Sequence, residues 1–222
     1  MKFKQHTVLP GFGLAMGFTL FYLAIIVLIP LSGLFIQTFQ MSPANFVSAA
    51  FDERVINSYR VTFTCTAIAA SINAVFGLIV AWVLVRYNFP CKKILDAFID
   101  LPFALPTAVA GIALAALYSF DGWVGAPLDK AGIQLAFNPS GIVIALIFVG
   151  LPFVVRTVQP VLEDLNPELE EAASSMGATR WQIFTKVLFP QILPALLTGF
   201  AMSFARALGE YGSVIFIAGN LP

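Results

Sequence analysis

The chain has 222 residues, of which 59% are hydrophobic and only 11% are charged, and its formal net charge is zero. Soluble domains carry roughly a quarter charged residues. A soluble core of this size could not bury so many apolar side chains, so the composition predicts a protein that crosses the membrane several times. The balanced charge argues against a nucleic-acid partner.

Cysteine and histidine give no sign of a disulfide framework, a metal site or a catalytic centre. Cys65 lies in an apolar run and Cys91 in a polar loop, and we expect both to be small packing residues. His6 is the single histidine and has no companions at ligand spacing. A membrane enzyme, which would need a catalytic cluster, is therefore disfavoured.

Five apolar stretches predict an all-α membrane protein with a single transmembrane domain over residues 1–222. The first is expected to be retained, because its apolar core is longer than that of a signal peptide and no small-residue cleavage site follows. In the second, Ala69, Asn73 and Gly77 recur every four residues, which permits close helix packing but also occurs by chance. The predicted spans cover residues 11–36, 61–85, 101–120, 140–158 and 191–208.

Prolines and one charged pair interrupt the later spans. Pro102 and Pro106 lie in the first turns of the third span, where they bend or break the helix and free backbone carbonyls. Arg206 and Glu210 are four residues apart near the end of the fifth span, so the two side chains can pair.

The longest polar segment, residues 163–190, is predicted to form a helix, a glycine turn and a second helix. Asn166 is a good N-cap and Pro167 a good first helical residue. Gly177 is the natural stop, because glycine takes the left-handed conformation at a helix end. Apolar residues recur at three-to-four spacing along the first helix and are expected to share one face: Leu165, Leu169, Ala172, Ala173 and Met176.

The second helix of this segment begins with a capping box. Thr179 and Gln182 have the T-x-x-Q spacing in which each side chain caps the other's backbone N–H. We expect Pro190 to limit this helix.

The distribution of Lys and Arg predicts the orientation. With the N-terminus in the cytoplasm, cytoplasmic segments hold Lys2, Lys4, Arg86, Lys92, Lys93, Arg156, Arg180 and Lys186, and external segments hold Arg54, Arg60 and Lys130. This bias places residues 163–190 in the cytoplasm.

Three interpretations of residues 163–190 follow from these patterns. A DNA-binding helix-turn-helix needs a basic recognition helix, whereas the first helix here is acidic and both ends are tethered to the membrane. A solvated cytoplasmic loop and a docking element that enters a groove on a soluble partner both remain open.

The residue pattern here resembles the EAA loop of ABC-importer permeases. Glu171, Ala172 and Ala173 are followed by Gly177 four positions later and then by Pro190. In that family the loop is the coupling helix, which a cleft on the ATP-hydrolysing subunit receives. The resemblance implies that these five residues form the ATPase-coupling site.

The likeness extends over most of the chain. Asp100–Gly111 and Phe153–Leu162 resemble the T-type permease subunit of bacterial sulfate/thiosulfate ABC importers. Ser203–Gly212 resembles the same subunit, but its residues Arg206–Gly212 and residues 218–222 are shared with molybdate permeases, so a molybdate/tungstate importer is the alternative. Members of the family continue through a further transmembrane helix, and the resemblance thus implies a C-terminal truncation or gene fragment.

The resemblance implies a type I ABC-importer permease (MetI-like) fold in the bacterial inner membrane. The implied partners are a second, W-type permease subunit, two ATP-binding subunits, a periplasmic sulfate/thiosulfate-binding protein and the lipid bilayer. No G-x-x-x-x-G-K-[ST] phosphate loop occurs in the chain, so we expect it to bind no cofactor and ATP and Mg²⁺ to lie on the partner. A secondary transporter would more often show repeated halves, which are not seen.

The candidate pathway residues are Arg206, Glu210, Thr107, Pro102 and Pro106. Arg206 either forms a salt bridge that fixes the helix end or faces the pathway and attracts a divalent oxyanion. The freed carbonyls at the prolines and the hydroxyl of Thr107 could contact the water shell of an anion, although helix packing explains them equally well.

Overall fold

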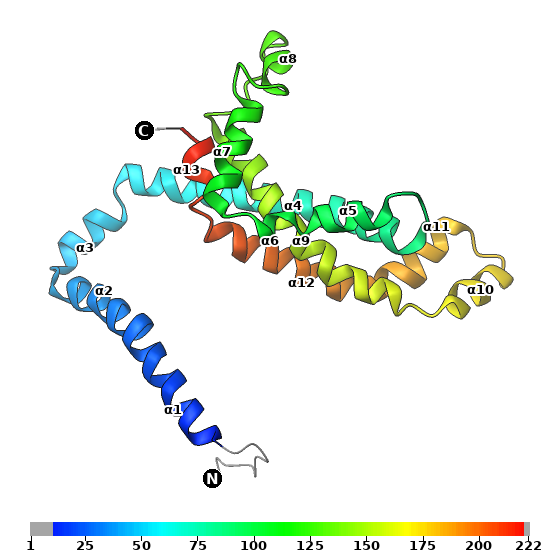
Figure 1. Cartoon of the computed structure of the whole chain (residues 1–222), viewed down its shortest axis with the longest axis horizontal. Helices are drawn as coiled ribbons and strands as arrows, with labels where there is room; N and C mark the ends of the chain where they lie inside the picture. The colour runs from blue at the N-terminus through cyan, green and yellow to red at the C-terminus, as the bar shows by residue number, and fades with distance from the viewer. Residues whose placement is uncertain (1–10, 220–222) are drawn as a thin grey trace. The chain divides into compact units, whose positions relative to one another are not determined.

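A computed structural model describes residues 11–219 (Figure 1). Lys2, Lys4, His6 and residues 220–222 lie outside the described residues. Within the described range the secondary structure is helical and no strand occurs. The contacts divide the chain into two compact units, residues 1–58 and 59–222, with the boundary inside helix α4, and the single transmembrane domain stays a prediction.

The first unit contains one long apolar helix that buries none of its residues. It runs from Phe12 to Gln40 as α1 (Phe12–Leu23), a π-helical turn (Ala24–Leu28) and α2 (Ile29–Gln40). At 1.5 Å per residue it is about 44 Å long, enough to cross a bilayer. Helix α3 (Pro43–Ala50) follows, capped by Ser42, whose Oγ accepts from the N–H of Asn45 at 3.2 Å.

The second unit is built around α9 (Pro139–Glu163). More than half of its most apolar stretch, 56%, is buried, against 33% for α4 (Glu53–Arg86) and 22% for the helix that ends with α12 (Phe189–Leu208). The core between these three helices consists mainly of Ala81, Leu84, Val154, Val155, Val158, Leu162 and Ile192. Since α9 buries most, it is the central helix of the bundle.

Small residues let α4, α9 and α12 pack closely, which is the first of the two interpretations that their spacing in α4 left open. A Cβ on Gly77 would lie 2.7 Å from a Val154 methyl group. A Cβ on Gly150 would lie 2.4 Å from Ser203 Oγ and 2.5 Å from Asn73 Nδ2. In this gap the fully buried Asn73 donates a hydrogen bond to Ser203 at 3.1 Å, which joins α4 to α12.

The predicted third span is not one helix. It divides into α6 (Leu101–Ala104) and α7 (Thr107–Tyr118), with Leu105 and Pro106 in extended conformations between them. Proline lacks a backbone N–H and pushes the preceding residue out of the helical region, so the break falls at Pro106. Helix α7 has 12 residues, about 18 Å, too short to cross alone. The described residues thus contain four helices of spanning length and one broken segment.

The predicted end at Pro190 is wrong. The helix continues from Arg180 to Leu208 through α11 (Arg180–Ile183), the π-helical turn η2 (Phe184–Leu188) and α12. A π-helical turn before a proline changes the hydrogen-bond partners of the backbone and lets the proline sit in an unbroken helix.

Arg156 joins the segment before the break to the central helix. Its Nε and Nη2 donate to the carboxylate of Asp100 at 2.8 and 2.7 Å, and its Nη1 donates to Asp96 at 2.7 Å. Asp96 belongs to α5 (Lys92–Ile99). The cysteines differ from one another: Cys65 is buried, as predicted, but Cys91 is exposed.

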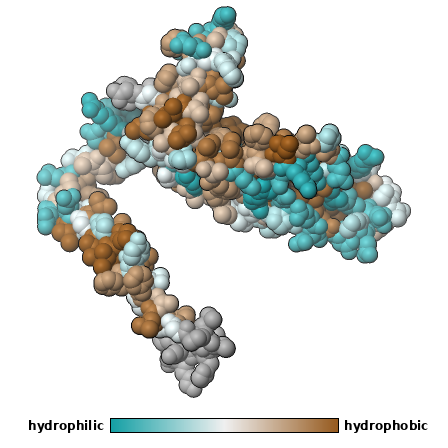
Figure 2. Space-filling view, viewed as in Figure 1, coloured by the Kyte–Doolittle hydropathy of each residue, from teal (hydrophilic) through white to brown (hydrophobic). Residues whose placement is uncertain are grey.

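The remaining helices mark the two ends of this unit. Figure 1 shows α10 (Pro167–Ser175) and α11 at one end and α7, α8 (Gly125–Lys130) and α13 (Val214–Ile217) at the other. In Figure 2 hydrophilic residues gather over the end with α10 and α11, whereas hydrophobic residues dominate over α7.

Candidate functional site

The first candidate site is the polar segment 163–190, whose turn is built as the sequence predicted. Asn166 Oδ1 accepts from the N–H of Glu168 at 3.0 Å and caps α10. Gly177 has a φ of 80°, and the N–H of Ala178 reaches the carbonyl of Ala173 at 3.1 Å. This hydrogen bond, which spans six residues, together with the left-handed Gly177, forms the Schellman motif that ends α10.

The capping box of the second helix is also present. Gln182 N–H donates to Thr179 Oγ1 at 3.3 Å, and Thr179 N–H donates to Gln182 Oε1 at 2.8 Å. The turn between the two helices is therefore held by backbone and side-chain hydrogen bonds within this segment alone.

The predicted apolar face of α10 is largely open. Ala173 and Leu165 are buried, but Leu169 is 41% exposed and Met176 82% exposed. Helix α10 buries only Ala173 against the rest of the chain. Among the other predicted coupling residues, Glu171, Ala172, Gly177 and Pro190 are exposed as well. The segment therefore leaves apolar side chains exposed rather than packed into the core of the chain.

The sequence patterns missed an ion pair that joins α10 to α4. Arg86, the last residue of α4, lies with Nη2 at 2.5 Å from Glu170 Oε1 and over the ring of Trp82. In the sequence Arg86 only marked the end of a span, and no periodicity connects it to Glu170.

The second candidate site lies at the other end of the bundle, around Glu210. The expected pairing is present: Arg206 Nη2 lies 2.7 Å from Glu210 Oε2. The side chain of Glu210 is 1% exposed, whereas that of Arg206 is 34% exposed. The other oxygen of Glu210 accepts from the N–H and the hydroxyl of Ser213 at 2.9 and 3.0 Å. Both carboxylate oxygens are thus satisfied, and the carboxylate is held from two sides.

Of the other pathway candidates, Thr107 lies beside this loop. A Cβ on Gly212 would lie 2.2 Å from Thr107 Oγ1, and a Cβ on Gly111 would lie 2.5 Å from the carbonyl oxygen of Ser213. The start of α7 therefore packs directly on the loop that holds Glu210. Pro102 lies within α6 and Pro106 at the break between α6 and α7, and their contact with an anion stays a prediction.

A cavity of about 320 Å³ opens next to Glu210. Its lining includes Glu210, Tyr211 and Thr66, whose buried hydroxyl has no hydrogen-bond partner among the described residues. Arg206 is not among its lining residues. Thr66 was missed because a single threonine in an apolar helix carries no pattern. Over the described range, no group of three His, Cys, Asp or Glu side chains could hold a metal ion.

Residues 73–222 match the family model described as binding-protein-dependent transport system inner membrane component. The chain belongs to this family. The match covers both candidate sites and, with the helices described above, confirms the predicted all-α membrane permease fold. The permease is a multi-pass membrane component and not itself the catalytic part of its transport system.

Individual relatives of this permease cover nearly all of the chain. It is 52% identical over 218 residues to the sulfate transport system permease protein CysT of Escherichia coli, a match that spans 98% of this chain and 79% of the relative. The protein of the same name from Salmonella typhimurium is 51% identical over the same shares. That of Synechocystis is 50% identical over 92% of this chain and 71% of the relative.

Proposed function

We propose that this permease carries sulfate or thiosulfate into the cytoplasm as part of an ATP-driven importer, coupled to an ATPase through residues 163–190. The similarity to sulfate transport system permease proteins supports the choice of anion. The observation that carries the coupling role is the preformed helix–glycine–helix unit with its exposed apolar side chains, Met176 and Trp181 among them.

The partners follow from this role. A second permease subunit would complete the pathway, two ATP-binding subunits would receive the coupling segments, and a periplasmic binding protein would deliver the anion at the bacterial inner membrane. ATP and Mg²⁺ would be held by the ATP-binding subunits, since this chain has no G-x-x-x-x-G-K-[ST] sequence. This chain contributes the movement of its helices.

The movement would begin at α10 and α11. Because α11 continues into α12 without a break in the helix, a displacement of the coupling segment reaches the membrane-spanning part directly. The permease pair is then the two-state element, and each soluble partner shifts it by binding one state more tightly.

The proposed orientation places the N-terminus and residues 163–190 in the cytoplasm. Cys91 provides a native test, because it is exposed whereas Cys65 is 4% exposed. A membrane-impermeant maleimide should label the permease in inside-out vesicles and not in right-side-out vesicles, and a Cys91→Ser control should remain unlabelled. Labelling only from the periplasmic face would reverse the orientation.

Arg206 is proposed to meet the anion only when it leaves Glu210. Its pairing cancels its charge, but it is far more exposed than its partner. A dianion could compete for Arg206 while Ser213 keeps Glu210 in place. Uptake of labelled sulfate by Arg206→Lys and Arg206→Gln at matched membrane abundance tests this role, and unchanged rates in both would remove it.

The function itself is tested in cells where this permease is the only T-type subunit. Uptake of labelled sulfate that thiosulfate inhibits, together with co-purification of an ATP-binding subunit, is the expected result. Uptake of molybdate without sulfate would assign the permease to the alternative anion, and failure to retain an ATP-binding subunit would reject the coupling role.

A further inference from the structure

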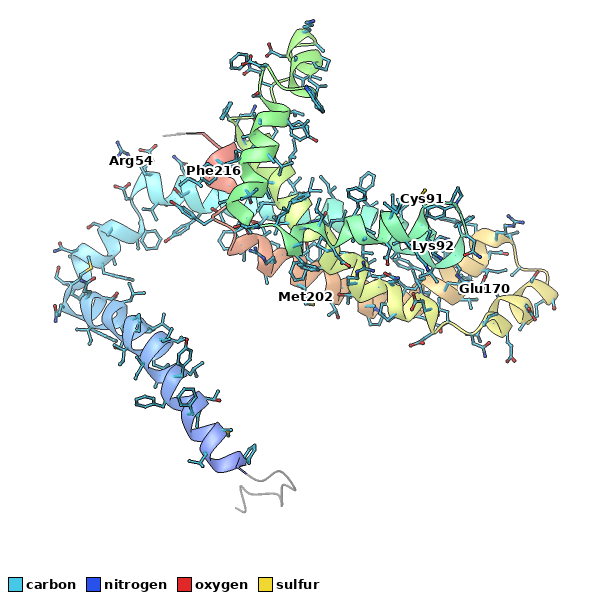
Figure 3. The ribbon with its side chains drawn as sticks, viewed as in Figure 1. Arg54, Cys91, Lys92, Glu170, Met202 and Phe216 are labelled. Carbon is cyan, nitrogen blue, oxygen red and sulfur yellow. The ribbon has the colours of Figure 1, made fainter. Side chains whose placement is uncertain are left out.

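Arg86 at the end of α4 contacts helix α10 of the coupling segment. The Arg86 guanidinium lies 2.5 Å from the carboxylate of Glu170 in α10, and its carbon lies 5.3 Å from the centre of the Trp82 ring. Figure 3 shows Glu170 at the end of the unit that also holds Cys91 and Lys92, which follow α4 in the chain.

Both charged groups depend on each other. Arg86 Nε and Nη2 and Glu170 Oε1 are shielded from solvent and have no hydrogen-bond partner in the part of the chain that the structure describes. The two side chains are 24% and 31% exposed, so the pair is only partly buried, and for the shielded atoms the opposite charge is the nearest compensation. Removal of either side chain leaves the facing atoms of the other without an opposite charge, so the two groups will tend to remain together when α10 moves, with the modest energy of a partly exposed pair.

The same end of α4 also contacts the second helix of the coupling segment. Trp82 meets the edge of Phe184 with ring centres 5.5 Å apart, and Phe184 stacks on Trp181 at 5.9 Å. Such aromatic pairs stabilise a contact beyond the area that they bury. One turn of α4 thus touches α10 through a charge pair and η2 through rings.

Helix α10 has few other attachments. It buries only Ala173, and short non-helical links, residues 164–166 and 176–179, connect it to α9 and α11. Without the Arg86–Glu170 pair, α10 could shift while α4 stays in place.

We propose that Arg86 is a positioning residue that makes α4 follow α10 during the transport cycle. This inference rests on the proposed coupling function. Arginine suits the role because its planar guanidinium can face a carboxylate and a ring together, which a lysine ammonium does less well. Glu170 is the partner that acts within the chain, which leaves the exposed Glu171 for the ATP-binding subunit.

The test uses the whole transport complex reconstituted in lipid vesicles, with anion uptake and ATP hydrolysis measured in one sample. Arg86→Gln and Glu170→Gln should each retain the ATP-binding subunit but lower the anion transported per ATP hydrolysed by about fivefold or more. The exchanged double variant, Arg86→Glu with Glu170→Arg, should recover most of this ratio. Lys93→Gln, which removes a nearby positive charge that forms no ion pair among the described residues, should leave it unchanged.

An unchanged ratio in both single variants would overturn the inference. The inference would also be overturned if the exchanged double variant assembles but transports no more anion per ATP hydrolysed than the single variants. Loss of the ATP-binding subunit in the single variants, with restoration by the exchange, would reduce the pair to an assembly contact and also reject a role in transmission. A wild-type complex that transports the anion without this subunit would instead reject the proposed function itself.

Discussion

Substitution of Gly177 tests whether the turn between α10 and α11 requires a residue with a positive φ. Its φ is 80°, a region that L-residues other than asparagine rarely adopt, and a Cβ at this position would meet nothing within 4 Å. The penalty is therefore conformational rather than steric, about 1–2 kcal/mol for an ordinary residue. That cost lowers the population of the turned segment by roughly 5- to 30-fold.

A graded series follows from this cause. Gly177→Asn should retain most transport, Gly177→Ala should lose several-fold, and Gly177→Val should lose most, because asparagine tolerates the left-handed region and β-branched side chains do not. The assay is retention of the ATP-binding subunit during purification, followed by sulfate uptake at matched abundance. Equal losses for Asn and Val would refute the conformational argument and indicate that the partner itself approaches the glycine.

Four further substitutions, one of them a control, test the packing and the polar contacts of the bundle by thermal unfolding in detergent. Gly150→Ala should lower the free energy of unfolding by about 1–3 kcal/mol through overpacking. Gly209→Ala is the control: its new methyl group would lie at least 3.9 Å from the surrounding atoms, so the free energy of unfolding should change by less than about 0.5 kcal/mol. Arg156→Lys should cost about 1 kcal/mol, because lysine cannot bind a carboxylate with two parallel N–H groups and the partly exposed pair is screened. Ser213→Ala should cost about 1 kcal/mol by removing one hydrogen bond to the buried carboxylate, and no change would show that its N–H alone suffices.

Local features of the fold could be predicted from the sequence because the interacting groups are near neighbours in the chain. The cap at Asn166, the turn at Gly177 and the box at Thr179 each depend on residues at most five positions away. Pro190 was misjudged because its effect depends on the π-helical turn before it, which no residue pattern indicated. Pro102 does not end a helix, since the first turn of α6 needs no N–H donor there.

Long-range contacts could not be predicted in this way. The pairs of Arg86 with Glu170 and of Arg156 with Asp100 join segments that only the packed bundle brings together. In the sequence each arginine was a charge at the end of a span, useful for orientation but without a partner. The charge-bias rule uses only the number of such residues on each side of the membrane, so it gives no information about their contacts.

The correction at Pro190 changes how the coupling segment acts on the membrane-spanning part. A coupling loop that ended at Pro190 could hinge there, and movement of α11 would be partly lost before it reached α12. The observed helix instead runs unbroken from Arg180 to Leu208, so Arg206 lies near the far end of the same helix whose first residues belong to the proposed coupling segment. At that end Glu210 is fixed by Ser213, while Arg206 is the more exposed partner. Under the proposed function, a displacement of the coupling segment would be carried along this helix as far as Arg206, the exposed partner from which a positive charge would be released for the anion.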